Sequence, residues 1–159
     1  MSKSAVSKRP TFEPGANALF WLNQAHHASR GAIIRAFKAG GADLTAEQWS
    51  ILEYLWFKKA APQTAIAKAT GRDKPAVTRL VVSLEEKGLL KRTRADMRTN
   101  TVKLTAKGQQ LHEEYGPVLK GIVNDALSSI SKKDLAIVHR SLMTLAVKLS
   151  KSGREADGA

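Results

Sequence analysis

The stretch DKPAVTRLVVSLEEKGLL, residues 73–90, decides the fold expected for this chain of 159 residues. Asp73 is a favoured residue for the amino-terminal cap of a helix, and Pro75 is tolerated in the first turn. Gly88 is typical of the position that follows a helix. The stretch therefore predicts a single helix that begins after Asp73 and ends at Gly88.

The two faces of this helix differ in chemistry. Successive side chains are about 100° apart around a helix, so one face collects the apolar residues Val77, Leu80, Val81 and Leu84. The opposite face collects Pro75, Thr78, Arg79 and Val82. One face would anchor the helix in a core, and the other would be free to bind a partner.

A shorter helix is expected just upstream, over residues 63–70, ending at Gly71. A short helix, a tight turn and a helix that carries Lys74, Thr78 and Arg79 near its start match a helix-turn-helix, whose second helix enters the major groove of DNA. In that geometry Arg79 can donate two hydrogen bonds to guanine, and Thr78 can contact thymine or a phosphate. The alternative for this segment alone is a solvated basic face on an ordinary surface helix.

Downstream of Gly88 the apolar period changes from helical towards two. Leu90 and Arg92 precede a polar, basic stretch, and Val102 and Leu104 follow it. This pattern predicts a β-hairpin. Between Arg72 and Lys103 there are nine Lys or Arg residues against four Asp or Glu, a local net charge of +5.

The hairpin tip is rich in arginine. Arg94 and Arg98 lie at or near it, and such a tip suits the narrow minor groove of DNA, where the negative potential is strongest. Asp96 lies two residues from each of them. Because phosphate repels an acidic group, Asp96 is expected either to orient one guanidinium through an ion pair or to form the turn itself.

Four more helices are expected outside these elements. The first runs from about residue 17 to Gly40, and the second begins at Thr45, where Gln48 has the spacing of a capping box. A long helix follows Thr105, and a last one begins near Ser131. The last helix repeats apolar residues at alternating spacings of three and four, as in a coiled coil: Leu135, Val138, Leu142, Leu145 and Leu149. A monomer would expose this row, so we expect a homodimer formed by the outer helices.

Composition narrows the class of function. The formal net charge is +12 and 43% of the residues are hydrophobic, which favours one globular domain with a polyanionic partner. Nucleic acid is the first candidate and an anionic membrane surface the second. The chain has no cysteine, which excludes disulfides and thiol-based redox sensing. No signal-peptide pattern or membrane-spanning apolar run is visible, so we expect a cytoplasmic protein.

Four segments together resemble the multiple antibiotic resistance regulator (MarR) family: residues 44–52, 73–90, 96–98 and 104–108. The resemblance covers roughly residues 16–150. It implies a mainly α fold with a small β-hairpin wing, in which a winged helix-turn-helix lobe (45–105) lies between dimerisation helices (16–40 and 106–150). Residues 1–15 and 151–159 would be flexible tails.

The resemblance also implies which residues bind DNA. Recognition positions in the fourth helix fall on Asp73, Lys74, Pro75, Thr78 and Arg79. The wing arginine falls on Arg98, with Asp96 as its acidic companion, and Arg94 belongs to the same basic tip. Arg72 departs from the family pattern, which usually has an apolar residue in this turn.

A small-molecule pocket is a further implication of the resemblance. Its candidate lining residues are Trp21, His26, Trp49, Tyr54 and Trp56, although aromatic residues at helical spacing are more often part of a core. The four histidines lack the spacing of a metal site, and no nucleophile or phosphate-loop motif is present. We therefore expect neither a metal, nor a cofactor, nor an enzyme.

Three functions remain open at this point. The favoured one is a dimeric repressor that binds a pseudo-palindromic double-stranded operator and is released by an aromatic or amphipathic ligand. The others are a non-specific architectural or RNA-binding protein and a nucleic-acid-processing enzyme. A recognition helix combined with an arginine-tipped wing favours the first, because it offers both base contacts and backbone contacts.

Overall fold

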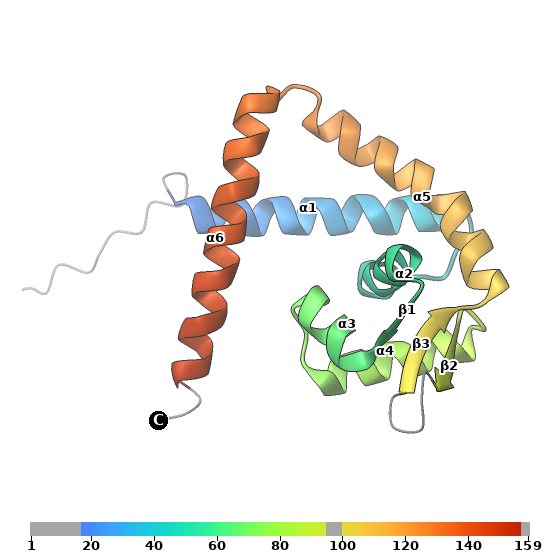
Figure 1. The fold of residues 1–159 in the computed structure, drawn as a ribbon. Coiled ribbons are helices and arrows are strands. Elements are labelled where there is room, and N and C mark those ends of the chain that lie inside the picture. Colours follow the sequence, from blue (N-terminus) through green and yellow to red (C-terminus); the bar gives the residue numbers. More distant parts are fainter. Residues whose placement is uncertain (1–16, 95–99, 157–159) are drawn as a thin grey trace, which may run out of the picture. The chain divides into compact units, whose positions relative to one another are not determined.

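The computed structural model describes residues 17–94 and 100–156. Six helices and three short strands follow one another within these residues: α1 (Ala18–Ala39), α2 (Ala46–Lys58), β1 (Ala60–Pro62), α3 (Gln63–Thr70), α4 (Lys74–Glu86), β2 (Leu90–Arg94), β3 (Asn100–Leu104), α5 (Ala106–Leu127) and α6 (Lys132–Ala156) (Figure 1). The expected fold class, mainly α with a β-hairpin wing, is confirmed. The chain forms two compact units that divide between Leu119 and Lys120, within α5.

The predicted helix caps are present. Thr45 and Gln48 form a capping box, in which the Thr45 hydroxyl accepts from the Gln48 N–H and the Gln48 amide oxygen accepts from the Thr45 N–H. Asp73 accepts a hydrogen bond of 2.6 Å from the N–H of Ala76. Ser131 accepts from the N–H of Asp134 at the start of α6. These local bonds satisfy backbone donors that the first helical turn leaves free, so they fix where each helix begins.

The sheet contains one strand that the sequence did not predict. Its order is β1-β3-β2, and both neighbouring pairs are antiparallel. The hairpin itself was expected, and it pairs Leu90 with Leu104 and Arg92 with Val102. Strand β1 has only three residues and ends in Pro62, which lacks an N–H, so it has neither the length nor the composition that would signal a strand.

The core of the first unit lies between α2, α3, α4 and the sheet (Figure 1). Its fully buried side chains are apolar and come from every one of these layers: Ile51, Leu52, Leu55, Ile66, Val77, Val81, Leu84 and Val102. A side-chain hydrogen bond also connects α2 to α4, because the Gln48 amide N–H donates to the Ser83 hydroxyl at 3.0 Å. Helix α4 is thereby held on its inner face by both packing and a hydrogen bond.

Aromatic rings join α1 and α5 to α2. Phe37 of α1 packs against Trp49, with ring centroids 5.6 Å apart, and against Tyr115, at 5.3 Å. His112 of α5 lies between Trp49 and Trp56, stacked at 4.9 and 4.3 Å. His112 is buried in this position.

A carboxylate completes this cluster. The Glu53 Oε2 lies 2.5 Å from the His112 Nε2. All three partners of the imidazole ring lie on one face of α2, because Trp49, Glu53 and Trp56 are spaced four and three residues apart. The arrangement fastens the first turns of α5 to the winged lobe.

Removing this ring is expected to destabilise the lobe. His112→Ala leaves a void between two indoles and should lower the free energy of unfolding by about 2–4 kcal/mol. His112→Phe keeps a stacked ring and should lose less, although it gives up the contact with Glu53. Urea unfolding followed by circular dichroism, at one fixed protein concentration, measures both. Equal losses for the two variants would show that stacking is not what stabilises this junction.

Beyond Leu119 the chain exposes apolar side chains on two helices. In α6 the exposed residues include Val138, Leu142 and Leu149 of the predicted coiled-coil row, and Leu135 and Leu145 are half-buried. The end of α5 exposes Val123 and Leu127. Among the described residues, no helix is both long enough and apolar enough to cross a membrane.

Candidate nucleic-acid interface

The turn between α3 and α4 is built from local backbone geometry. Gly71 ends α3 in the left-handed region, with a φ of 65° that suits glycine. The N–H of Arg72 donates to the Ala67 carbonyl at 3.0 Å, and Asp73 then caps α4. These bonds fix the angle at which α4 leaves α3, which is the defining feature of a helix-turn-helix.

Helix α4 has one buried face and one free face, as predicted. Val77, Val81 and Leu84 are each 0% exposed. The opposite side carries Lys74, Pro75 and Arg79, all of which are exposed. Arg79 forms no hydrogen bond or ion pair with any described residue. Its guanidinium is therefore available to an external partner.

Thr78 lies in a different environment from these neighbours. It is half-buried, and its hydroxyl is 2.9 Å from the Gln63 Oε1 and 2.9 Å from the Lys74 carbonyl oxygen. Sequence reasoning placed Thr78 on the binding face but did not identify Gln63. Nothing in the pattern of either helix connects these two residues, which are 15 positions apart.

The wing is described only at its base. Arg94 is the last residue of β2 and pairs with Asn100 across the hairpin. The predicted tip residues Asp96 and Arg98 lie outside the described residues. Nearer the base, Arg92 forms an ion pair of 3.1 Å with Glu85 of α4. This pair links the hairpin to the last turn of α4.

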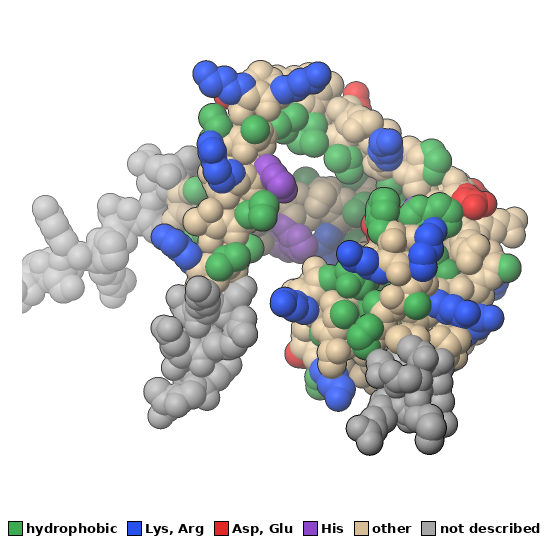
Figure 2. All heavy atoms as spheres, in the orientation of Figure 1, with side chains coloured by type: hydrophobic (Ala, Val, Ile, Leu, Met, Phe, Trp, Pro, Cys, Tyr) green, Lys and Arg blue, Asp and Glu red, His purple; other side chains and the backbone are tan. Residues whose placement is uncertain are grey.

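Positive charge predominates around α3 and α4. In the view of Figure 2, Lys and Arg side chains are spread over the winged lobe and Asp and Glu side chains are sparse. Arg72, the residue that departed from the expected pattern, is half-buried in the turn, and its Nε is buried without a hydrogen-bond partner among the described residues. An anionic ligand on this side of the lobe would meet a positive potential.

The five predicted pocket residues lie in three different environments. Trp21 is 58% exposed on α1, and His26 is also exposed there. Trp49 and Trp56 both stack on His112, so each has one ring face covered. Tyr54 is half-buried on α2. The pocket prediction stays a prediction.

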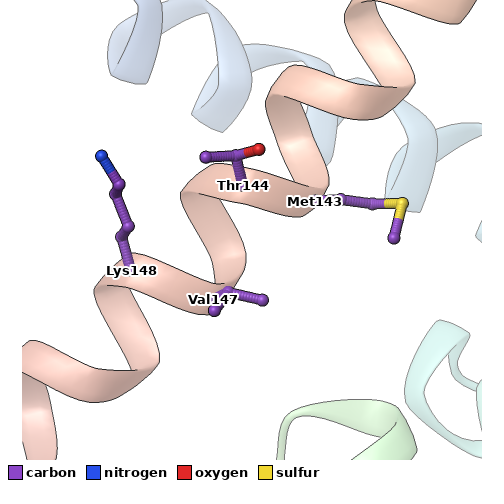
Figure 3. A pocket seen from close by; sticks show the side chains of 4 residues that line it. All are labelled: Met143, Thr144, Val147 and Lys148. Atoms are coloured by element: carbon purple, nitrogen blue, oxygen red, sulfur yellow. The ribbon is translucent and has the colours of Figure 1, made fainter.

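An open pocket lies on α6, and none of the five predicted residues lines it. Its lining consists of Met143, Thr144, Val147 and Lys148, on consecutive turns of one helix (Figure 3). The pocket is open to solvent and its surface is mostly apolar, so it is not an enclosed cavity. Within the described part of the chain, no group of three or more His, Cys, Asp or Glu side chains is placed to hold a metal ion.

One segment of the chain matches a known protein family. Residues 44–97 match the model of the MarR family. Over these residues the lobe is similar to the MarR family. The matched segment begins just before α2 and includes the helix-turn-helix and strand β2.

Solved structures extend the likeness beyond this segment. CouR from Rhodococcus jostii RHA1, bound to p-coumaroyl-CoA, is 22% identical over 84% of this chain and 94% of its own, with a TM-score of 0.77. The S. aureus MepR–DNA complex is 23% identical over 86% and 99%, with a TM-score of 0.76. Bordetella bronchiseptica BpsR, whose DNA binding is regulated by 6-hydroxynicotinic acid, is 21% identical over 86% and 99%, with a TM-score of 0.72. At these identities the likeness concerns the fold.

Proposed function

We propose that this protein is a sequence-specific, double-stranded-DNA-binding transcriptional regulator that acts as a homodimer. The observation that carries the proposal is the division of α4, whose buried apolar face anchors it while Lys74, Pro75 and Arg79 remain exposed. A rigidly held helix with free polar and cationic groups near its start can place them against base edges in the major groove. The function is thus one of binding rather than catalysis.

The roles of individual residues follow from their chemistry. Arg79 would donate two hydrogen bonds to guanine, and Lys74 would bind a phosphate. Asp73 would act indirectly, because its carboxylate is engaged in the helix cap. In the wing, Arg94 and Arg98 would enter the minor groove and Asp96 would orient one of them, as the sequence suggests.

A dimer is part of the proposal because one α4 reaches only one half-site. The exposed apolar residues of α6 supply a surface for a second copy, and a symmetric pair would place two recognition helices against a pseudo-palindromic operator. MepR is a related fold crystallised with DNA, which supports the same use of the lobe here.

Competition with random duplex separates this proposal from a non-specific architectural role. A gel-shift assay would use an operator fragment selected by the protein itself, with increasing excess of random duplex as competitor. A specific regulator should retain most of its labelled operator at a 100-fold excess or so, because specific affinities typically exceed non-specific ones by about 1,000-fold or more. Loss of the complex at equal concentrations would instead indicate an architectural protein.

We further propose that the protein is a repressor whose DNA binding is weakened by a small aromatic or amphipathic ligand. CouR binds an aromatic acyl-CoA, and BpsR responds to an aromatic acid. The proposed contacts are the five residues predicted from the sequence: Trp21, His26, Trp49, Tyr54 and Trp56. A ligand can shift the protein only as far as its affinities for the two states differ.

Screening aromatic acids and their thioesters in the same gel-shift assay tests this proposal. At least one compound should lower operator affinity by about tenfold or more, within the range usual for coupling between sites. Peroxide should have no effect through thiol oxidation, because the chain contains no cysteine. Normal operator binding that no compound in the panel alters would count against a ligand-responsive regulator.

A further inference from the structure

Gln63 occupies a position that connects three elements of the winged lobe. It is the first residue of α3 and directly follows Pro62, which pairs with Thr101 in β3. Its side chain is half-buried and lies beside α4, where the Thr78 hydroxyl is 2.9 Å from its Oε1. The carboxamide is therefore held in one place by the recognition helix.

The hydrogen-bonding capacity of this pair is only partly used. The Thr78 hydroxyl has one proton and two acceptors within reach, the Gln63 Oε1 and the Lys74 carbonyl. The NH₂ group of Gln63 has two protons, and neither has a partner among the described residues. A fixed amide with free donors next to α4 is suited to an acceptor that comes from outside the chain.

We propose that Gln63 binds the DNA backbone, donating an amide N–H to a phosphate oxygen at the edge of the groove that α4 enters, and that Thr78 is the positioning residue that holds the amide. The inference rests on the proposed DNA-binding function. In a helix-turn-helix the first helix, here α3, crosses the sugar–phosphate backbone while the second lies in the groove. Neutral amide side chains are regular donors to phosphate.

A neutral phosphate contact has its own signature. It adds affinity on any duplex, because every sequence presents the same phosphates. It displaces no counterion by its own charge, so its loss should leave the slope of log K against log salt unchanged, whereas losing a Lys or Arg contact flattens it. Gln63→Ala should therefore weaken binding by about tenfold on operator and random duplex alike, with an unaltered salt slope and unaltered base preference.

Gln63→Glu sharpens the test. The carboxylate still accepts from Thr78 but cannot donate to phosphate, and its charge is repelled, so affinity should fall further than for Gln63→Ala. The matched control is Gln109→Glu, the same change at an exposed position in the first turns of α5, and it should bind nearly as the wild type does. Unchanged thermal unfolding of each variant shows that the lobe is intact.

The role of Thr78 is tested by coupling. Thr78→Val keeps the shape and removes the hydroxyl, so it should weaken binding in the wild-type background but add nothing to Gln63→Ala. Thr78→Ser retains the hydroxyl and should preserve the coupling to Gln63. Effects of Gln63→Ala and Thr78→Val that simply add would overturn the positioning role of Thr78.

Two outcomes overturn the Gln63 contact itself. One is wild-type affinity of Gln63→Ala on random duplex. The other is a changed preference at one base position, which would mean a base contact instead. Both outcomes are measured with the Gln63 variant on random or mixed duplex. The proposed regulator function has a separate test, because it fails only if the wild-type protein selects no specific site.

Discussion

Replacing Leu142 and Leu145 with aspartate is expected to convert the proposed dimer to monomers and to abolish operator binding in the same step. Both residues belong to the α6 row of apolar side chains; Leu142 is 40% exposed in the single chain and Leu145 is half-buried. In a symmetric interface the change would bury four carboxylates, each costing several kcal/mol when unpaired. Dimerisation should weaken by at least about 1,000-fold, since roughly 1.4 kcal/mol corresponds to a factor of ten.

Arg140→Asp is the matched control, because it changes the net charge of the chain by the same two units. Arg140 is exposed on α6, on the side of the helix away from the apolar row. This variant should remain dimeric in sedimentation and should bind the operator. A double-aspartate variant that stayed dimeric, or a monomer with full operator affinity, would contradict the role given to α6.

Arg79→Ala is expected to reduce operator affinity and to relax the sequence preference at one base pair of each half-site. Arg79 is exposed on the free face of α4 and has no partner among the described residues, so its loss should not disturb the lobe. A bidentate contact with guanine contributes about 1–3 kcal/mol of discrimination per site, and the dimer has two. Binding to random duplex should change far less.

Arg79→Lys separates charge from geometry at the same position. Lysine keeps the positive charge but not the planar pair of donors, so non-specific affinity and salt slope should be retained while base preference weakens. Binding of both variants to operator and random duplexes across a salt series measures these effects. If base preference survived Arg79→Ala unchanged, α4 would not be the recognition helix at that position.

Features set by neighbouring residues were predictable from the sequence. The caps at Thr45, Asp73 and Ser131 depend on side chains within three residues of the helix start, and all three are present. The two faces of α4 follow from the helical period alone, and Val77 and Val81 are buried as expected. Such features need no knowledge of the rest of the chain.

Features that depend on distant contacts were not predictable. Strand β1 exists only because β3 pairs with it, and its three residues carry no periodic signal. The contact between Gln63 and Thr78 requires α3 and α4 to be placed first. The cluster around His112 likewise joins residues more than fifty positions apart in the chain. The spacing of Trp49, Glu53 and Trp56 on one face of α2 was the one available hint.

Selection of bound fragments from a pool of random duplex DNA, with the full-length protein at physiological salt, tests the central claim most directly. The account predicts enrichment of one inverted repeat, because two symmetry-related α4 helices must reach successive major grooves. The centres of its half-sites should lie about one helical turn apart, which is roughly 34 Å or about 10 base pairs. Fragments carrying it should outcompete the starting pool by about 1,000-fold or more. A selected pool with no common sequence, bound no more tightly than the starting pool, would contradict sequence-specific recognition by this protein.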